Sequence, residues 1–394
     1  MRRDCKKVPL TDLVKGYIDN RGKTVPTSEE GIPLIATNCI KERGLFPIKE
    51  KLRYVSQEIY DSWFRAHPEP FDIIIVNKGT PGLVCFVPDP VDFCIAQDMV
   101  ALKIDEEKVY KKYLFAFMRS EDFKHQVSSL VVGTTIPHLK KTDFKLLNIP
   151  LPEYSVQKYI GDLYFNIMHK IEVNININQI LEEMAMSLYK ERFVVRGDIE
   201  RVGIEQFGDI IGGGTPKTSI SEYWDGNIPW ISVKDLDSSV IIDTEKKITD
   251  LGLKNSSTKL LPSFSTVISA RGTIGNISII GDEMTMNQSC YAIKAKEDLD
   301  CFVFLTLKRS IDTLINQSHG SVFNTITTST LRSLQFPYEI KKAREFEEDV
   351  KHLFQQILSN IRENKELQNI NSYLFPSLFS GETDFKQKFE LNNI

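Results

Sequence analysis

The sequence lacks the patterns that mark most metal-binding, disulfide-bonded and membrane proteins. Its six cysteines contain no CxxC pair and its six histidines no HxxxH pair, so the spacing indicates neither a zinc site nor a disulfide framework. No apolar run approaches the ~18 residues of a membrane span, and no apolar segment of signal-peptide length follows the basic start of the chain. We therefore expect free cysteines and a cytoplasmic protein.

A strong positive charge is also missing. The formal net charge is −4, and the separate sums are only +2 for residues 1–154 and −3 for residues 194–338. Contacts from Lys and Arg to phosphates supply much of the affinity of nucleic-acid-binding proteins. If this chain binds DNA, we expect a partner to provide part of the phosphate contacts.

Catalytic motifs are absent as well. Residues 16–24 nearly spell a phosphate-binding loop, but five residues instead of four separate the two glycines, which displaces the backbone N–H groups from the phosphates. Pro88-Asp89 with residues 106–108 imitates a nuclease triad, yet Asp89 lies between prolines. Gly212-Gly213-Gly214 lacks the GxGxxG spacing, and the Asp/Asn-Pro-Pro-aromatic tetrapeptide of an amino-methyltransferase does not occur. The sequence therefore predicts no active site.

What the sequence does contain is an internal repeat. Its clearest part recurs at an offset of 187 positions (320 − 133 = 187). The matched positions are Gly133/Gly320, Leu139/Ile326, Phe144/Leu331, Leu147/Leu334, Ile149/Phe336 and Pro150/Pro337. Solenoid repeats have periods of about 20 to 50 residues, so this longer period indicates a duplicated domain with its linker. Two similar surfaces suit a bipartite target.

The repeat continues upstream with small gaps. The further matches are Asn77–Gly82 with Ala270–Gly275 (offset 193), Ile32-Pro33 with Ile228-Pro229 (offset 196), and Ala96-Gln97 with Asn287-Gln288 (offset 191). The order is kept while the offsets drift. This pattern is typical of two domains that share a fold and differ in what they bind.

Residues 1–154 and 199–338 have the pattern of two mixed α/β (α+β) domains. β-rich runs such as residues 72–76 and 266–269 end in glycine turns, and the apolar spacing predicts short helices at 114–123 and 302–315. A proline-marked stop and a long helical stretch follow each domain. We assign these stretches to residues 155–198 and 339–394.

Both long stretches show heptad spacing of apolar residues. The expected seam consists of Ile160, Ile167, Asn174, Leu181 and Leu188 in the first stretch and Val350, Ile357, Asn364 and Leu367 in the second. Sustained heptads favour a coiled coil, and an asparagine in the seam sets the register. We expect two antiparallel helices of ~35 residues, a rod of roughly 50 Å. The alternative is that each stripe is the buried face of a helix within a compact domain.

The motifs in this order resemble the specificity subunits of type I restriction-modification systems, and the resemblance covers essentially the whole chain. The residues that carry it are Gly212–Thr218, Tyr223-Trp224, Ile228–Leu236, Arg271–Gly275 with Asn287-Gln288, Gly133–Leu139, Ile149–Pro152, Leu188–Phe193 and Leu374–Glu382. The resemblance implies two target-recognition domains joined by two long helices that form an antiparallel coiled coil.

The resemblance further implies a protein without catalysis of its own. Each domain would read one half of a split double-stranded DNA sequence. The helices would fix the gap between the halves and dock two methyltransferase subunits. Restriction and translocase subunits would complete the assembly, and S-adenosylmethionine, ATP and Mg²⁺ would belong to the partners, so that no cofactor or metal is expected on this chain.

Readout in the major groove uses Arg or Lys on guanine, Asn or Gln on adenine, and small hydroxyl or methyl groups. The candidate DNA contacts are Asn38, Lys41, Arg43, Lys78 and Thr80 in the first domain and Lys217, Thr218, Lys234, Arg271 and Thr273 in the second. Lys140 and Lys141 lie near the helix entry, where contacts to phosphate are expected to position the protein without reading the sequence.

Two other functions are compatible with the sequence. A coiled-coil scaffold could present two domains that bind protein ligands, and an enzyme could be fused to a recognition module. The missing catalytic motifs disfavour the enzyme. Sequence-selective, salt-dependent binding to duplex DNA would separate recognition from a scaffold.

Overall fold

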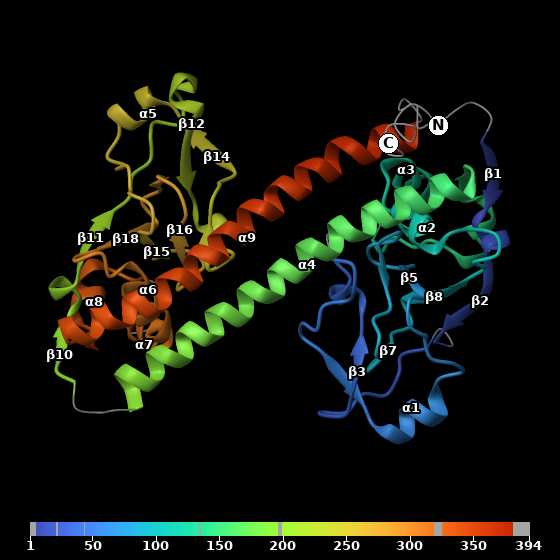
Figure 1. Cartoon of the computed structure of the whole chain (residues 1–394), viewed down its shortest axis with the longest axis horizontal. Coiled ribbons are helices and arrows are strands. Elements are labelled where there is room, and N and C mark those ends of the chain that lie inside the picture. Colours follow the sequence, from blue (N-terminus) through green and yellow to red (C-terminus); the bar gives the residue numbers. More distant parts are fainter. Residues whose placement is uncertain are drawn as a thin grey trace, which may run out of the picture. The chain divides into compact units, whose positions relative to one another are not determined.

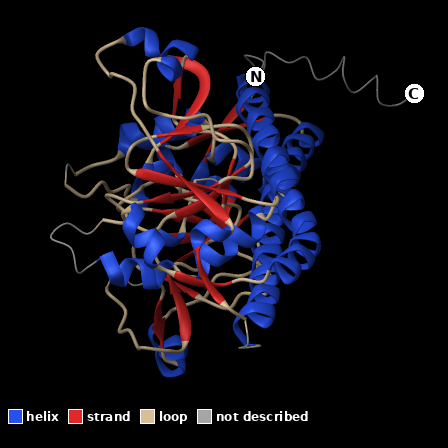
Figure 2. Cartoon of the chain, turned by 90° about the vertical axis from the view of Figure 1, so that its left-hand side faces the viewer, coloured by secondary structure: helices blue, strands red, loops and turns tan. Residues whose placement is uncertain are grey.

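The structure is a computed structural model that describes residues 5–20, 23–42, 44–133, 135–195, 199–318 and 325–380. The chain forms two compact units. Unit 1 consists of residues 1–173 and 364–394, and unit 2 consists of residues 174–363. In both units the strands are short and are joined by extended loops (Figure 2).

Unit 1 is built on an antiparallel sheet of four strands in the order β2-β8-β5-β6. A smaller sheet, β4-β3-β7, pairs β3 with β7 in parallel, and β1 pairs with β9. The strands are β1 (Lys6–Pro9), β2 (Val14–Asp19), β3 (Ile32–Ile35), β4 (Arg53–Val55), β5 (Ile73–Val76), β6 (Val84–Phe86), β7 (Cys94–Ile95), β8 (Met99–Ile104) and β9 (Asn148–Leu151). The short helices are α1 (Gln57–Trp63), α2 (Lys111–Met118) and α3 (Glu121–Leu130), with 3-10 turns η1 (Leu10–Leu13), η2 (Thr37–Cys39) and η3 (Lys141–Leu146).

Unit 2 repeats this topology and adds one strand. Its larger sheet has the order β11-β18-β15-β16-β13, its smaller sheet the order β14-β12-β17, and β10 pairs with β19. The strands are β10 (Arg201–Gly203), β11 (Gly208–Gly212), β12 (Trp224–Ile231), β13 (Val240–Ile241), β14 (Lys246–Ile248), β15 (Thr266–Ser269), β16 (Ile277–Ile280), β17 (Thr285–Met286), β18 (Cys290–Ala295) and β19 (Gln335–Pro337). The helices are α5 (Asp250–Lys254), α6 (Asp300–Arg309), α7 (Ile311–Ser318) and α8 (Thr328–Ser333), with 3-10 turns η5 (Ile204–Gln206), η6 (Ser221–Tyr223) and η7 (Val233–Asp235).

Equivalent hydrogen bonds show that the repeat in the sequence is a repeat in the fold. In unit 1 the N–H of Ala96 donates to the carbonyl of Ile35 at 2.9 Å. In unit 2 the N–H of Asn287, 191 positions later (287 − 96), donates to the carbonyl of Ile231 at the same distance. The predicted fold class, two similar domains of mixed helix and strand content, is therefore confirmed.

The two longest helices are α4 (Tyr154–Lys190), which continues into a π-helical turn at Glu191–Val195, and α9 (Ile340–Ser380) (Figure 1). Each unit contains one half of each helix. In unit 1 the side-chain amide of Asn364 donates to the carbonyl of Ile171 at 3.4 Å, and Asn371 lies beside Met168. Residue numbers rise along one helix as they fall along the other, so these halves are antiparallel.

The halves in unit 2 are antiparallel as well. Asn178 contacts Asn360, and Asn174 contacts Glu363 at 2.8 Å. A buried or half-buried group of amides therefore lies along this part of the helix pair. Its polarity matches the asparagines of the predicted seam.

The seam residues are buried to different extents. Ile160, Ile167, Asn174, Val350, Ile357 and Asn364 are buried, whereas Leu181, Leu188 and Leu367 are half-buried. Beyond Asn174 the fully buried residues are instead Ala185, Tyr189 and Phe193, which pack into the core of unit 2. The long helices thus contribute to the cores of the globular domains. This agrees with the alternative prediction, in which each apolar stripe is the buried face of a helix within a compact domain.

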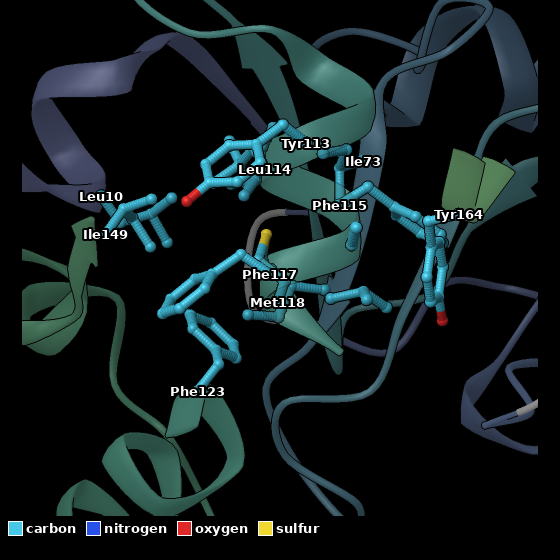
Figure 3. Packing of buried hydrophobic residues seen from close by; sticks show 14 of the residues in the cluster. Leu10, Ile73, Tyr113, Leu114, Phe115, Phe117, Met118, Phe123, Ile149 and Tyr164 are labelled. Atoms are coloured by element: carbon cyan, nitrogen blue, oxygen red, sulfur yellow. The ribbon is translucent and has the colours of Figure 1, made fainter. Parts of the chain in front are cut away.

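The core of unit 1 is organised around α2. Residues 113–118 are all buried, because the sheet covers one side of this helix and α4 another. Figure 3 shows Phe115 beside Ile73 of β5 and Tyr164 of α4, and Phe117 facing Phe123 of α3. Unit 2 repeats the arrangement with α6, where residues 301–307 are buried. A helix that is apolar on all sides is stable only when it is enclosed in this way.

Both short helices expected from apolar spacing are wrong in their extent. The segment 114–123 is divided between α2 and α3, because the Ser120 hydroxyl accepts the N–H of Phe123 and starts a new helix. The segment 302–315 is divided between α6 and α7 at Ser310. Among the described residues, no helix is long and apolar enough to cross a membrane.

Candidate nucleic-acid interface

Four segments of unit 2 meet at residues 287–289. The N–H of Asn287 donates to the carbonyl of Ile231, the last residue of β12, at 2.9 Å. The N–H of Ala270 donates to the carbonyl of Ser289 at 2.8 Å. The Thr215 hydroxyl donates to the side-chain carbonyl of Gln288. The loop after β11, the loop after β12, the turn after β15 and the start of β18 are therefore joined into one loop cluster, which we call the unit 2 loop cluster.

The glycine-rich loop of this cluster is a packing element. A Cβ atom on Gly213 would lie 1.9 Å from the carbonyl oxygen of Asn287. The carbonyl of Gly214 accepts the indole N–H of Trp230 at 3.0 Å, and its N–H donates to the carbonyl of Met286. Only glycine permits this close approach, because the backbone of Asn287 lies directly against the loop.

The candidate residues of unit 2 are all exposed on this cluster. Lys217 and Thr218 follow the glycine-rich loop, and Lys234 lies on η7, whose first turn is closed by a reciprocal Ser232–Asp235 capping box. Arg271 and Thr273 lie on the turn between β15 and β16. Cationic and hydroxyl side chains are among the groups that major-groove readout uses, and here they are presented by loops held in place by hydrogen bonds.

Unit 1 has the corresponding loop cluster. The N–H groups of Asn77 and Lys78 donate to the carbonyl of Asp98 at 2.9 and 3.2 Å, and the N–H of Gly79 donates to Pro137 at 3.0 Å. The amide of Asn77, which is buried, donates to the carbonyl of Leu139. The turn between β5 and β6 is thereby joined to the start of β8 and to the segment that leads into η3.

The candidate residues of unit 1 carry less free charge than the sequence suggested. Lys41 lies 3.5 Å from Glu50, Lys141 forms an ion pair with Asp19, and the amide of Asn38 donates to the carbonyl of Glu50 at 2.9 Å. The exposed residues Lys78, Thr80 and Lys140 complete this set. Arg43 lies outside the described residues.

Three polar residues of the clusters were missed as candidates. They are Thr215 and Gln288 in unit 2 and the half-buried Gln97 in unit 1. A signal was available, since Ala96-Gln97 and Asn287-Gln288 belong to the internal repeat. His138, which forms a β-bridge with Lys78, is a fourth neighbour, and it lies in the motif segment Gly133–Leu139.

The cysteines next to the clusters are packing groups. All six cysteines are free thiols, and burial raises the pKa of Cys94 and of Cys290 to about 12, so both remain neutral packing groups. Within the described ranges, no group of three or more His, Cys, Asp or Glu residues could hold a metal ion. The segment that imitated a phosphate-binding loop begins inside strand β2, where Tyr17 pairs with Leu102.

Comparison with known proteins connects both domains to DNA recognition. The family model described as "Type I restriction modification DNA specificity domain" matches residues 3–183 and again residues 197–372. Each match covers one repeated domain and most of the long helix that follows it.

Two curated relatives are type I restriction enzyme specificity subunits. The MjaIX subunit of Methanocaldococcus jannaschii is 31% identical over 193 residues, which are 47% of this chain and 44% of the relative. The HindI subunit of Haemophilus influenzae is 23% identical over 387 residues, which are 76% of this chain and 84% of the relative. The match therefore spans less than half of the first relative and most of the second.

A solved structure shows the same fold. It is the S subunit of a type I restriction-modification system from M. genitalium, with a TM-score of 0.63 and 14% identity over 96% of this chain and 97% of that one. The family to which the two domains match is one of recognition and not of catalysis, as the missing catalytic motifs had predicted. With its two matched domains, the chain belongs to the type I restriction-modification DNA specificity family.

Proposed function

We propose that this chain recognises a bipartite sequence in double-stranded DNA, with unit 1 reading one half and unit 2 the other. The observation that carries the proposal is the repeated loop cluster. Both clusters use the same backbone hydrogen bonds, and the exposed side chains around them differ, for example Asn38 on η2 and Lys234 on η7. A common framework with different polar groups suits two different half-sites.

The long helices would set the gap between the two half-sites. A helix of 37 residues, the length of α4, measures about 55 Å at 1.5 Å per residue. Changing its length would then change the gap without changing the bases that are read.

The helices would also dock two methyltransferase subunits. Ile177, Ile180 and Met184, which lie three and four positions apart on α4, are 38%, 56% and 50% exposed. Residues with this spacing share one helix face, and an exposed apolar row supports a contact with another protein. The ion pairs of Lys41 and Lys141 support a contribution of partner subunits to phosphate binding.

In this proposal the partners carry the catalytic chemistry. Methyltransferase subunits would bind S-adenosylmethionine, and restriction subunits would bind ATP with Mg²⁺. The assembly would act in the cytoplasm, where the DNA of a restricting cell lies. The rival function, a scaffold that holds two protein ligands, has weaker support, because the clusters expose Lys, Arg, Gln and Thr side chains that suit DNA.

A methylation map with and without this chain tests the proposal. We expect cells that express the chain with its methyltransferase to methylate one split sequence, and cells that lack only this chain to leave it unmethylated. The purified complex should retain duplex DNA carrying that sequence, less strongly as the salt concentration rises. An unchanged methylation map, together with no sequence-selective retention, would favour the scaffold.

A further inference from the structure

The two loop clusters share one exposed turn. In unit 1 it is Lys78-Gly79-Thr80-Pro81-Gly82, and in unit 2 it is Arg271-Gly272-Thr273-Ile274-Gly275. Both turns connect equivalent antiparallel strands, β5 with β6 and β15 with β16. In both, a cation, a glycine and a threonine occupy the first three positions, and all three are exposed.

The second glycine fixes the base of each turn. A Cβ atom on Gly82 would lie 3.0 Å from Val127 of α3, and one on Gly275 would lie 3.0 Å from Ile315 of α7. This glycine therefore lets the turn pack closely on the neighbouring helix. The turn has a defined position relative to the rest of its cluster.

The first glycine has no such packing reason. Gly79 and Gly272 have φ angles of +90° and +78°, and no atom lies within 4 Å of a Cβ placed on either. The positive φ favours glycine, and the side that a Cβ would occupy is open. The tip of the turn thus offers bare backbone, flanked by a cation and a hydroxyl group, to any molecule that approaches the cluster.

The same glutamine adjoins each turn. Gln97 precedes Asp98, whose carbonyl accepts the N–H of Asn77, the residue before Lys78, at 2.9 Å. Gln288 precedes Ser289, whose carbonyl accepts the N–H of Ala270. Equivalent backbone hydrogen bonds therefore place a segment with a glutamine beside a turn with a cation and a threonine in both units.

Shared residues cannot tell two different half-sites apart. The feature that all half-sites have in common is the phosphodiester backbone, and contacts to it position a protein without reading bases. We infer that the Lys/Arg-Gly-Thr turn and its neighbouring glutamine form a DNA-backbone anchor, present once in each unit. The inference rests on the proposed function and assigns Arg271 and Thr273 to phosphate contacts and not to base readout. Readout then falls to positions where the clusters differ, such as Lys234.

The experiment uses the full chain assembled with its methyltransferase. The variants are Arg271→Ala, Arg271→Lys and Thr273→Val, with Lys78→Ala for the other unit. Two duplex probes of equal length are compared, one carrying the methylated sequence and one of random sequence. Lys296→Ala is the matched control, because it removes one positive charge from the opposite end of β18, a six-residue strand that spans roughly 20 Å.

We expect Arg271→Ala to weaken binding to both probes by a similar factor, so that their ratio is kept. The plot of the log of the binding constant against the log of the salt concentration has a negative slope. Its steepness should decrease by about 1 for each phosphate that the variant no longer neutralises. Arg271→Lys should recover most of the affinity, because a phosphate accepts either cation. Thr273→Val, which keeps the shape of the side chain, should also weaken both probes, and the control should match the wild type.

Two results would overturn the anchor. One is a loss of affinity confined to the cognate probe and to bases of the second half-site, with Arg271→Lys as defective as Arg271→Ala, because this would make Arg271 a base reader. The other is unchanged binding to both probes in every variant whose melting temperature equals that of the wild type. Failure of the wild-type complex to bind any DNA selectively would instead reject the proposed function.

Discussion

The carboxylate of Glu347 on α9 accepts the backbone N–H of Phe302 at 2.9 Å, in the first turn of α6. It accepts the N–H of Cys301 as well, at 3.1 Å. In unit 1 the side-chain carbonyl of Gln157 on α4 accepts the N–H of Tyr110, the N-cap of α2, at 3.0 Å. The two capping residues are 190 positions apart (347 − 157). In each unit, a side chain of one long helix therefore accepts N–H groups at the start of the buried helix: α9 caps α6 in unit 2, and α4 caps α2 in unit 1.

Replacing Glu347 by Gln should stabilise the protein increasingly as the pH rises. Burial raises the pKa of Glu347 above its ordinary value of 4.5, so the folded chain binds this proton more tightly than the unfolded chain does. The protonated Glu347 therefore adds to the free energy of unfolding at a pH below its ordinary pKa. This contribution is lost as the pH rises through the raised pKa of the folded chain. Urea unfolding of Glu347→Gln and wild type between about pH 4 and pH 8 measures the difference.

Glu347→Ala is the matched comparison. It leaves two backbone N–H groups in the core without an acceptor and should cost about 1 to 3 kcal/mol. A wild type whose stability relative to Glu347→Gln increased with pH would contradict the assigned direction of the pKa.

Asn178 and Asn360 should be energetically coupled. The amide of Asn360 donates to the side-chain carbonyl of Asn178 at 2.8 Å, and Asn360 is 5% exposed. Each single substitution to Leu leaves an amide against an apolar group and should cost about 1 kcal/mol. The double variant should recover that loss, which urea unfolding of all four proteins measures. Additive losses would show that the contact contributes nothing of its own.

Lengthening the helix pair by one turn should widen the gap in the recognised sequence. The insertion goes into α4 between Asn174 and Leu181, with a matched one in α9 between Ile357 and Asn364, because contacts such as Asn178–Asn360 pair these segments. Sequencing the methylated sites should show the same half-sites farther apart. Altered half-sites with an unchanged gap would remove the spacing role from the helices.

Lys234→Ala should alter only the second half-site. Lys234 lies on η7 of unit 2 and is exposed, and its counterpart on η2 is Asn38. Lys140→Ala, at the proposed phosphate position of unit 1, serves as the comparison and should weaken binding to all sequences alike. Methylation maps of both variants decide, and a change in the first half-site on loss of Lys234 would contradict the assignment of readout to separate units.

The repeat made most of the fold predictable from sequence. Matches such as Ala96-Gln97 with Asn287-Gln288 occupy equivalent hydrogen-bonded positions, because the backbone framework requires them in both copies. The strands at 72–76 and 266–269 were predicted from β-rich runs that end in glycine turns, and they correspond to β5 and β15. A short apolar run such as β5 or β15 predicts its own structure correctly because it is buried in the core as a strand.

Tertiary contacts determine which helix residues are buried and which charges are paired, and these features could not be predicted from sequence. Heptad spacing placed Leu181 and Leu188 in the seam, whereas Tyr189 and Phe193 are buried there, because α4 turns their face toward the core of unit 2. The ion pair of Lys141 with Asp19 joins residues 122 positions apart. The sequence around either residue does not predict this ion pair. For this reason exposed charge at the candidate site could not be judged from sequence alone.

The division of the helices between the units governs how specificity could be exchanged during evolution. Unit 2 is one uninterrupted stretch, residues 174–363, whereas unit 1 is assembled from two stretches. A crossover pair at 199 and 338 would replace Phe302 while leaving its neighbours Tyr189 and Phe346 behind, and the new core would be mismatched. Recombination within the two long helices instead transplants a complete core, so that natural hybrids of such genes should have their junctions there.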